Sequence, residues 1–110
     1  MVNYVWPACP AGTATALTRP FEKFGVPGVA YVAALPKLDS LGDSQDAVTR
    51  SNLLVCENNN VLGPMHSAHP EIAKEGHGRY SHWINSLIFS SSDNTNPNTN
   101  GRTYSVVQPR

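Results

Sequence analysis

The residues best suited to binding or chemistry in this 110-residue chain lie between Gly76 and Tyr104. This stretch predicts two strands joined by a tight turn, a long polar loop and a further strand. Side chains alternate across a sheet, so Trp83 would share one face with the serines around it. An indole ring among hydroxyls, amides and a guanidinium suits a neutral, polyhydroxylated ligand. The predicted ligand-binding residues are Trp83, Ser81, Ser90, Ser92, Asp93, Asn94, Asn100, Arg102, His66 and His69.

The histidines offer a different chemistry. His66 and His69 are three residues apart, a spacing that on a helix or turn can direct two imidazoles at one ion. With His82 as a third ligand, these side chains would form a zinc site. The structural alternative places His69 at the N-cap of a helix and His82 on the core face of its strand.

The loop from Ser90 to Arg102 is the strongest polar feature. Asn, Asp and Ser side chains fold back onto the backbone, so tight turns alone explain such a composition. Calcium is a further alternative for this loop, although Asp93 supplies its one carboxylate.

Catalytic residues are not predicted, and an enzyme is not favoured. No Gly-x-Ser-x-Gly elbow presents a serine nucleophile. Asp93 is also the single acid between Gly76 and Arg110, whereas glycoside cleavage uses two carboxylates.

Composition excludes several classes of partner. The eight basic and eight acidic residues balance, which leaves no basic footprint for nucleic acid. No apolar run is long enough to span a bilayer. The N-terminus lacks the features of a signal peptide, which favours a cytoplasmic location over an export route without such a mark. The length predicts a single domain, residues 1–110, with an extended arm at 1–12 and a motif-rich β core at 61–108.

The central hairpin is predicted to pair Arg79 to Ile84 with Leu87 to Ser92 across an Asn85-Ser86 turn. Ile84 would then face Leu87, and His82 would face Phe89. The core face would carry Tyr80, His82, Ile84, Leu87 and Phe89. The opposite face would carry Arg79, Ser81, Trp83, Ile88, Ser90 and Ser92.

Frequent proline, glycine and asparagine favour short strands and structured turns elsewhere. The predicted elements are a short helix within 13–24, a buried strand at 29–35, a surface loop at 37–50, a strand at 51–57, a helix at 69–76 and a closing strand at 102–108. The expected fold is a small antiparallel β-sandwich or jelly-roll-like domain with one or two short helices, with an α+β meander as the alternative. Cys9 and Cys56 are either buried free thiols or a disulfide between the arm and a strand.

Several short motifs in residues 61–104 carry a resemblance. They are Leu62-Gly63-Pro64, His66-Ser67, His69, Gly78-Arg79, Ser81-His82-Trp83, Phe89-Ser90, Ser92-Asp93-Asn94 and Thr99-Asn100-Gly101-Arg102. This run resembles an uncharacterised segment of bacterial surface-polysaccharide proteins, found beside or within glycosyltransferase-like and methyltransferase-like chains. The resemblance implies an accessory, carbohydrate-associated β domain and does not extend to residues 1–50.

Three functions follow as hypotheses. The first is a non-catalytic, lectin-like module for a sugar or glycan, without a metal. The second is a histidine-based metal-binding protein or metal-dependent enzyme. The third is a structural or assembly protein, since short strands with exposed edges favour a homo-oligomer.

Overall fold

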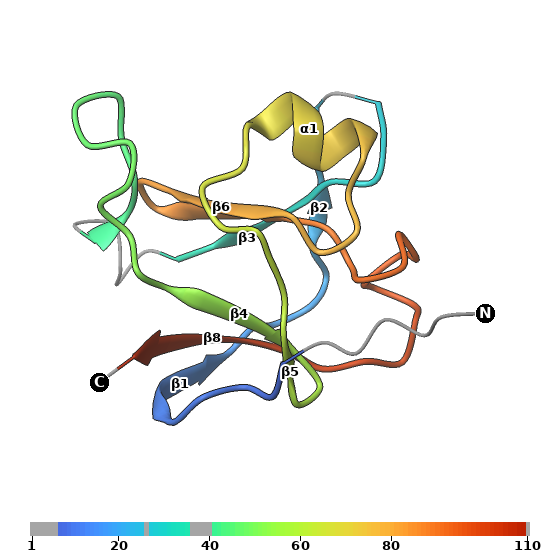
Figure 1. Ribbon diagram of the computed structural model, residues 1–110. Helices are drawn as coiled ribbons and strands as arrows, with labels where there is room; N and C mark the ends of the chain where they lie inside the picture. Colours follow the sequence, from blue (N-terminus) through green and yellow to red (C-terminus); the bar gives the residue numbers. More distant parts are fainter. Residues whose placement is uncertain (1–6, 26, 36–40, 110) are drawn as a thin grey trace.

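We describe the protein from a computed structural model, of which residues 7–25, 27–35 and 41–109 are described. These residues form a small antiparallel β-sandwich of two four-stranded sheets with one short helix (Figure 1). The elements are β1 (Gly12–Ala16), β2 (Glu22–Lys23), β3 (Tyr31–Ala34), β4 (Leu54–Glu57), β5 (Asn60–Val61), α1 (His69–Lys74), β6 (Tyr80–Trp83), β7 (Ser86–Phe89) and β8 (Tyr104–Pro109). One sheet has the order β1-β8-β4-β5 and the other β2-β3-β7-β6. The predicted fold class is confirmed.

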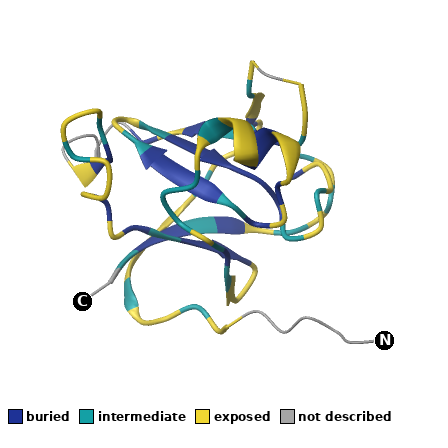
Figure 2. Ribbon diagram, turned by 45° about the horizontal axis from the view of Figure 1, so that its top comes forward, coloured by how far each residue is buried: buried dark blue, intermediate teal, exposed yellow. Residues whose placement is uncertain are grey.

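The main core lies between the two sheets, where Figure 2 shows the inward strands as buried. Tyr80 and Phe89 face it from one sheet, and Val55 and Val106 face it from the other. Phe21 packs edge-on against Phe89, with ring centroids 5.1 Å apart. Interdigitation of two inner faces is the usual way in which a sandwich buries its apolar side chains.

A second, smaller core lies on the outer face of the β2-β3-β7-β6 sheet. There α1 covers the sheet, as Figure 1 shows, and buries Ile72 and Ala73 against Ile88. Trp83 packs against the same cluster. The helix thus closes part of the face on which the sequence places Trp83.

The β6–β7 hairpin keeps the predicted faces but not the predicted register. Trp83 pairs with Ser86 and His82 with Leu87, so the turn is Ile84-Asn85 rather than Asn85-Ser86. The partner of each residue shifts by two, which leaves every side chain on its predicted face. Ile84 is the exception, because at the turn its φ is +52° and its side chain is 47% exposed. The physical reason is tertiary: Ile84 N–H donates to Asp43 O and Leu35 N–H to Asn85 O, which fixes the tip of the hairpin.

Helix α1 begins one residue earlier than predicted. Ala68 is its N-cap, and His69 is the first helical residue rather than the cap, followed by Pro70, which suits the first turn. Gly76, with φ +63°, follows the C-cap as expected for a helix end. In the described part of the chain, no helix is long and apolar enough to cross a bilayer.

The predicted helix within 13–24 is wrong. The segment forms β1 and β2 instead, because β1 pairs along its whole length with β8, with Ala14 opposite Val107. Alternating threonines suit a strand, and this long-range pairing supplies the hydrogen bonds that a local helix would have used.

The other predicted strands are present but shorter, as β3, β4 and β8. Full burial of the strand at 29–35 is wrong, because Ala34 is exposed and Tyr31 and Val32 are half-buried. Its neighbour β2 has only two residues and covers little of it. Residues 1–6 of the predicted arm and residues 37–40 of the predicted loop lie outside the described residues.

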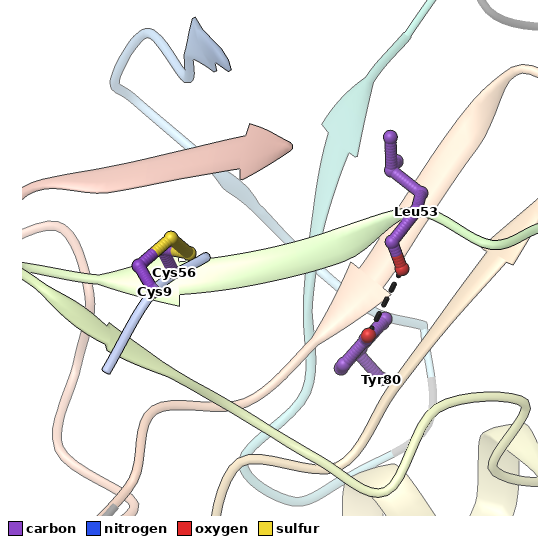
Figure 3. The surroundings of a disulfide bond; sticks show 4 residues. All are labelled: Cys9, Leu53, Cys56 and Tyr80. Carbon is purple, nitrogen blue, oxygen red and sulfur yellow. Dashed lines mark hydrogen bonds between the residues drawn. A yellow bond between two sulfur atoms is a disulfide. The ribbon is translucent and has the colours of Figure 1, made fainter. Parts of the chain in front are cut away.

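Cys9 and Cys56 form a disulfide with Cα atoms 6.0 Å apart, so the prediction of buried free thiols is wrong and its alternative is confirmed. Figure 3 shows the bond joining the N-terminal arm to β4. Backbone bonds from Cys9 N–H to Asn59 O and from Val61 N–H to Pro7 O hold the same arm against β5. Nearby, the Tyr80 hydroxyl donates to Leu53 O at 2.9 Å and links the two sheets (Figure 3). Disulfides persist in oxidising compartments, which weighs against a cytoplasmic location.

Candidate functional site

The loop that precedes α1 runs along the free edge of β6. Tyr80 N–H donates to Pro64 O, and Ser67 N–H donates to Tyr80 O. Between them His66 adopts a positive φ of +56°, a conformation that non-glycine residues rarely take. This backbone places the imidazole of His66 beside the outer face of β6, where Ser81 and Trp83 point.

A second segment approaches the turn end of β6 and brings a carboxylate. Asp43 N–H donates to His82 O at 2.7 Å, and Ile84 N–H donates to Asp43 O at 2.9 Å. The approach requires Gly42, because a Cβ at this position would lie 2.3 Å from Ile84 O. Asp43 is consequently 1% exposed although it belongs to the predicted surface loop.

These elements enclose a shallow hollow of about 340 Å³, which we call the α1 depression. Its lining consists of Asp43, Val48, His66, Ser67, Ala68, His69, Pro70, Ser81 and Trp83. Four of the ten predicted ligand-binding residues, Ser81, Trp83, His66 and His69, therefore share one hollow. Its volume lies near the lower end of the range of about 300–1,000 Å³ that is typical of small-molecule sites.

Asp43 and His66 form the charged part of the α1 depression. His66 Nδ1 lies 2.5 Å from Asp43 Oδ2, and Ser51 N–H donates to Asp43 Oδ1 at 2.7 Å. A carboxylate only accepts, so the proton on His66 lies on Nδ1 and leaves Nε2 for another partner. Behind Asp43, Ser51 Oγ and His82 Nδ1 share a hydrogen bond of 2.8 Å, which extends the polar chain into the core.

His69, Ser81 and Trp83 form the opposite wall. His69 Nε2 shares a hydrogen bond of 3.3 Å with Ser81 Oγ, and Ser81 is 3% exposed. The His69 and Trp83 rings pack edge-to-face, with centroids 5.5 Å apart and an interplanar angle of 89°. Burial lowers the pKa of His69, which favours the neutral imidazole. Because Ala68 rather than His69 is the N-cap of α1, the His69 imidazole is free to reach Ser81.

Most of the other predicted site residues gather elsewhere, in what we call the Glu57 network. Glu57 is buried at the end of β4 and accepts from Ser92 Oγ at 2.6 Å, Ser92 N–H at 3.1 Å and the Tyr104 hydroxyl at 2.7 Å. Asn100 Nδ2 donates to the same Tyr104 hydroxyl. Burial, followed by the bond to Glu57, raises the pKa of Tyr104.

Asp93 and Arg102 complete the Glu57 network as a bidentate pair. Arg102 Nη1 and Nη2 each lie 2.8 Å from an oxygen of Asp93. The bond from Arg102 holds the pKa of Asp93 below its usual range, and Thr95 Oγ1 also donates to this carboxylate. A guanidinium already neutralises the one carboxylate of the loop, which disfavours calcium there.

The remaining two predicted ligand-binding residues, Ser90 and Asn94, form hydrogen bonds with backbone groups. Ser90 is fully buried, and its Oγ accepts from Gly78 N–H and donates to Arg79 O. Asn94 accepts from His77 N–H and donates to Glu75 O, which ties the loop to the end of α1.

The α1 depression and the Glu57 network lie at opposite ends of the β6–β7 hairpin. Trp83 lies beside the turn, whereas Ser90 N–H donates to Arg79 O at the open end. At about 3.3 Å per residue, these positions are roughly 13 Å apart along β6. The single predicted face thus divides into the α1 depression and the Glu57 network.

The three histidines of the predicted metal alternative are not brought together. His82 points into the core between the sheets, away from the face that His69 contacts. Among the described residues, no group of three or more His, Cys, Asp or Glu side chains is arranged to hold an ion.

Sequence reasoning missed Asp43, Ser51 and Glu57. Asp43 and Ser51 carried no signal, because their roles depend on the close approach at Gly42. Glu57 did carry one: it alternates with Leu53 and Val55, so a carboxylate falls on a core face and needs partners.

Two larger hollows lie elsewhere on the described surface. One of about 590 Å³ touches Ser92 and is otherwise lined by Pro7, Val61, Leu62, Gly63, Pro64, His77 and Arg79. The other, of about 850 Å³, lies beside β1 and β3 and includes none of the predicted residues. Neither combines an aromatic ring with a carboxylate and hydroxyls.

No protein family, curated protein or solved structure shows significant similarity to this chain. The resemblance to polysaccharide-associated segments therefore stays a prediction. The fold and the α1 depression are therefore described from the residues of this chain alone.

Proposed function

We propose that this protein is a non-catalytic carbohydrate-binding module and that the α1 depression holds its ligand. One observation carries the proposal: Trp83, Ser81, His66 and His69 line one hollow with a buried carboxylate, Asp43. The indole supplies apolar surface for the carbon face of a sugar ring. The imidazoles and the serine supply directional polar groups for its hydroxyls.

The pairing of Asp43 with His66 defines the polar specificity. With Nδ1 engaged by Asp43, a neutral His66 presents Nε2 as an acceptor for a sugar hydroxyl, and a protonated His66 presents a donor. Either form interacts with a hydroxyl, which both donates and accepts. A neutral polyol is therefore a better match than a carboxylate, which Asp43 would repel.

A histidine-based metal site is the second candidate, reduced to His66 and His69 beside Asp43. Carboxylate-bound imidazoles are common ligands of zinc, because the carboxylate orients the ring. Elemental analysis of protein purified without a histidine tag or chelator tests this candidate. Stoichiometric zinc that is lost in His66→Ala and His69→Ala would favour it over the sugar site.

The test of the carbohydrate proposal is a neutral glycan array probed with labelled protein, followed by calorimetric titration of a retained glycan. His66→Ala removes one hydrogen-bonding wall of the α1 depression and is expected to weaken affinity about tenfold, the value of one well-placed hydrogen bond. His77→Ala is the matched control, since His77 is exposed and lies outside the depression. Retention of no neutral glycan, or equal losses in the two variants, would overturn the proposal.

Trp83 is tested by Trp83→Leu rather than by Trp83→Ala. Its ring also packs against the α1 cluster, so complete truncation would mix loss of binding with loss of packing. Leucine keeps apolar bulk against the helix but removes the flat ring, and it is expected to abolish retention on the array while the thermal midpoint changes little.

A further inference from the structure

The outer edge of β1 differs from the other sheet edges of the described chain. β5 is covered by the arm through Val61 N–H to Pro7 O, and β6 is flanked by the loops that carry Asp43 and Pro64. β2 has two residues, both charged. β1 has five residues, GTATA, with no charge and no proline, and residues 13–16 are exposed. Proteins normally block such an edge with charges, bulges or covering loops.

The backbone groups available at this edge follow from the pairing of β1 with β8. Leu17 N–H donates to Tyr104 O, so these two residues form a hydrogen-bonded pair. Hydrogen-bonded and non-hydrogen-bonded pairs alternate in an antiparallel ladder, which directs Thr15 and Thr13 toward β8. The N–H and C=O groups of Gly12, Ala14 and Ala16 therefore face outward.

These outward groups are arranged symmetrically about Ala14. An antiparallel second copy centred there would pair Ala14 with its own counterpart and Gly12 with the Ala16 of the other copy. Every outward N–H would then meet an outward C=O. The same register sets Thr13 opposite Thr15, and cross-strand threonine pairs stabilise sheets. Gly12 and the alanines are small, so no side chain obstructs the approach.

We propose that the outer edge of β1 binds the same edge of a second copy of this chain, in antiparallel register centred on Ala14. The two β1-β8-β4-β5 sheets then join into one continuous sheet across the dimer. A second copy fits this edge because the side chains that this register apposes are small and uncharged, and each Thr13 meets a Thr15. The α1 depression lies on the outer face of the other sheet and stays open, and the inference does not depend on what that depression binds.

The test is sedimentation velocity of the full chain from about 1 µM to about 1 mM, the range expected for an association of few contacts. The wild type is expected to shift with concentration from 11.9 kDa toward twice that mass. Ala14→Pro deletes the central outward N–H and is tolerated on an edge, because this N–H does not bond β8. Ala14→Lys keeps the N–H but apposes two charges. Both variants are expected to remain monomeric with an unchanged circular dichroism spectrum, and Ser105→Ala, on the interior strand β8, is the control that still dimerises.

Register gives a second readout. Under mild oxidation Ala14→Cys is expected to cross-link to its own copy, whereas Thr13→Cys is expected to cross-link efficiently only when mixed with Thr15→Cys. A wild type that stays monomeric throughout would overturn the inference. So would a dimer that persists in Ala14→Pro and Ala14→Lys, or cross-linking without regard to register.

Discussion

The α1 depression and the Glu57 network both combine a carboxylate with hydroxyls and a cation or potential cation. They differ in how many of these polar groups already have partners within the chain. In the Glu57 network, Glu57 accepts hydrogen bonds from Ser92, Tyr104 and Arg102, and Asp93 is held by both arms of Arg102. In the α1 depression, Asp43 binds Nδ1 of His66, and this imidazole lines a hollow. The number of polar groups does not separate a structural cluster from a binding site. What separates them is whether the partners are already supplied by the chain.

Position in the fold explains this difference. The Glu57 network joins the long 90–103 loop to β4 and β8, so its bonds replace the regular pairing that a loop lacks. The α1 depression lies between a helix, two loops and the edge of a sheet, where no element of the described chain fills the space. Variants can test whether this division between stability and binding is correct.

The largest effect is expected from the disulfide, on the side of the Glu57 network. The double variant Cys9→Ser, Cys56→Ser opens a link across 47 residues and is expected to lower the free energy of unfolding by about 4 kcal/mol. Urea unfolding measures the change. Glycan affinity of the folded fraction is expected to stay the same, and a parallel loss of affinity would show that the two regions are coupled.

Glu57→Gln comes next. The amide keeps the size of the side chain but opposes donors from Ser92 and Tyr104, so we expect a loss of about 2–3 kcal/mol in the free energy of unfolding. Glu22→Gln, at an exposed position of β2, is the matched control and is expected to change little. Similar stabilities for the two variants would mean that the network is not structural.

Asp43→Asn addresses the α1 depression. The variant keeps the acceptor for Ser51 N–H but weakens the orientation of His66, so glycan affinity is expected to fall about tenfold. Asp93→Asn is the comparison in the Glu57 network and is expected to leave affinity within about twofold while shifting acid unfolding. Calorimetric titration distinguishes the two variants, and the reverse order of affinities would exchange the roles assigned to the regions.

The smallest effect is a pH dependence of stability from His69. Burial lowers the pKa of His69, so at acidic pH the unfolded chain binds more protons than the folded chain. This contribution to stability is complete above the ordinary histidine pKa of about 6.5 and is lost as the pH falls toward the lowered value. Thermal midpoints measured in steps from pH 7.5 to pH 4.5 would show a shallower decline in His69→Gln than in His77→Gln. Parallel curves for the two variants would contradict the assignment.

The sequence predicted the fold class and the faces of the central hairpin, because alternation with period two survives an error in register. It did not predict the register itself, since the Ile84-Asn85 turn depends on Asp43 and Leu35, which are distant in sequence. The prediction of a helix within 13–24 was also wrong because of a contact that is distant in sequence. Its residues become a strand through β8, about ninety positions away along the chain.

Four residues of the candidate site, Ser81, Trp83, His66 and His69, were predicted as part of a larger set. Their separation from Ser92, Asp93 and Arg102 was not predictable, because it depends on which hydroxyls and amides find partners within the chain. Asp43 was missed because its loop becomes buried only where Gly42 meets the hairpin turn. Residue types indicated the kind of chemistry, and tertiary contacts decided which residues stay available for it.

The most direct test of the central claim is a two-dimensional ¹H–¹⁵N NMR titration of the wild-type protein with a neutral glycan retained on the array. We expect the Trp83 indole N–H and the backbone amides of Ser67, His69 and Ser81 to shift with one saturation curve, while the Arg102 guanidinium and the Asp93 amide stay unchanged. Shifts centred on Arg102 and Asp93, with none at Trp83, would contradict the claim and assign ligand binding to the Glu57 network.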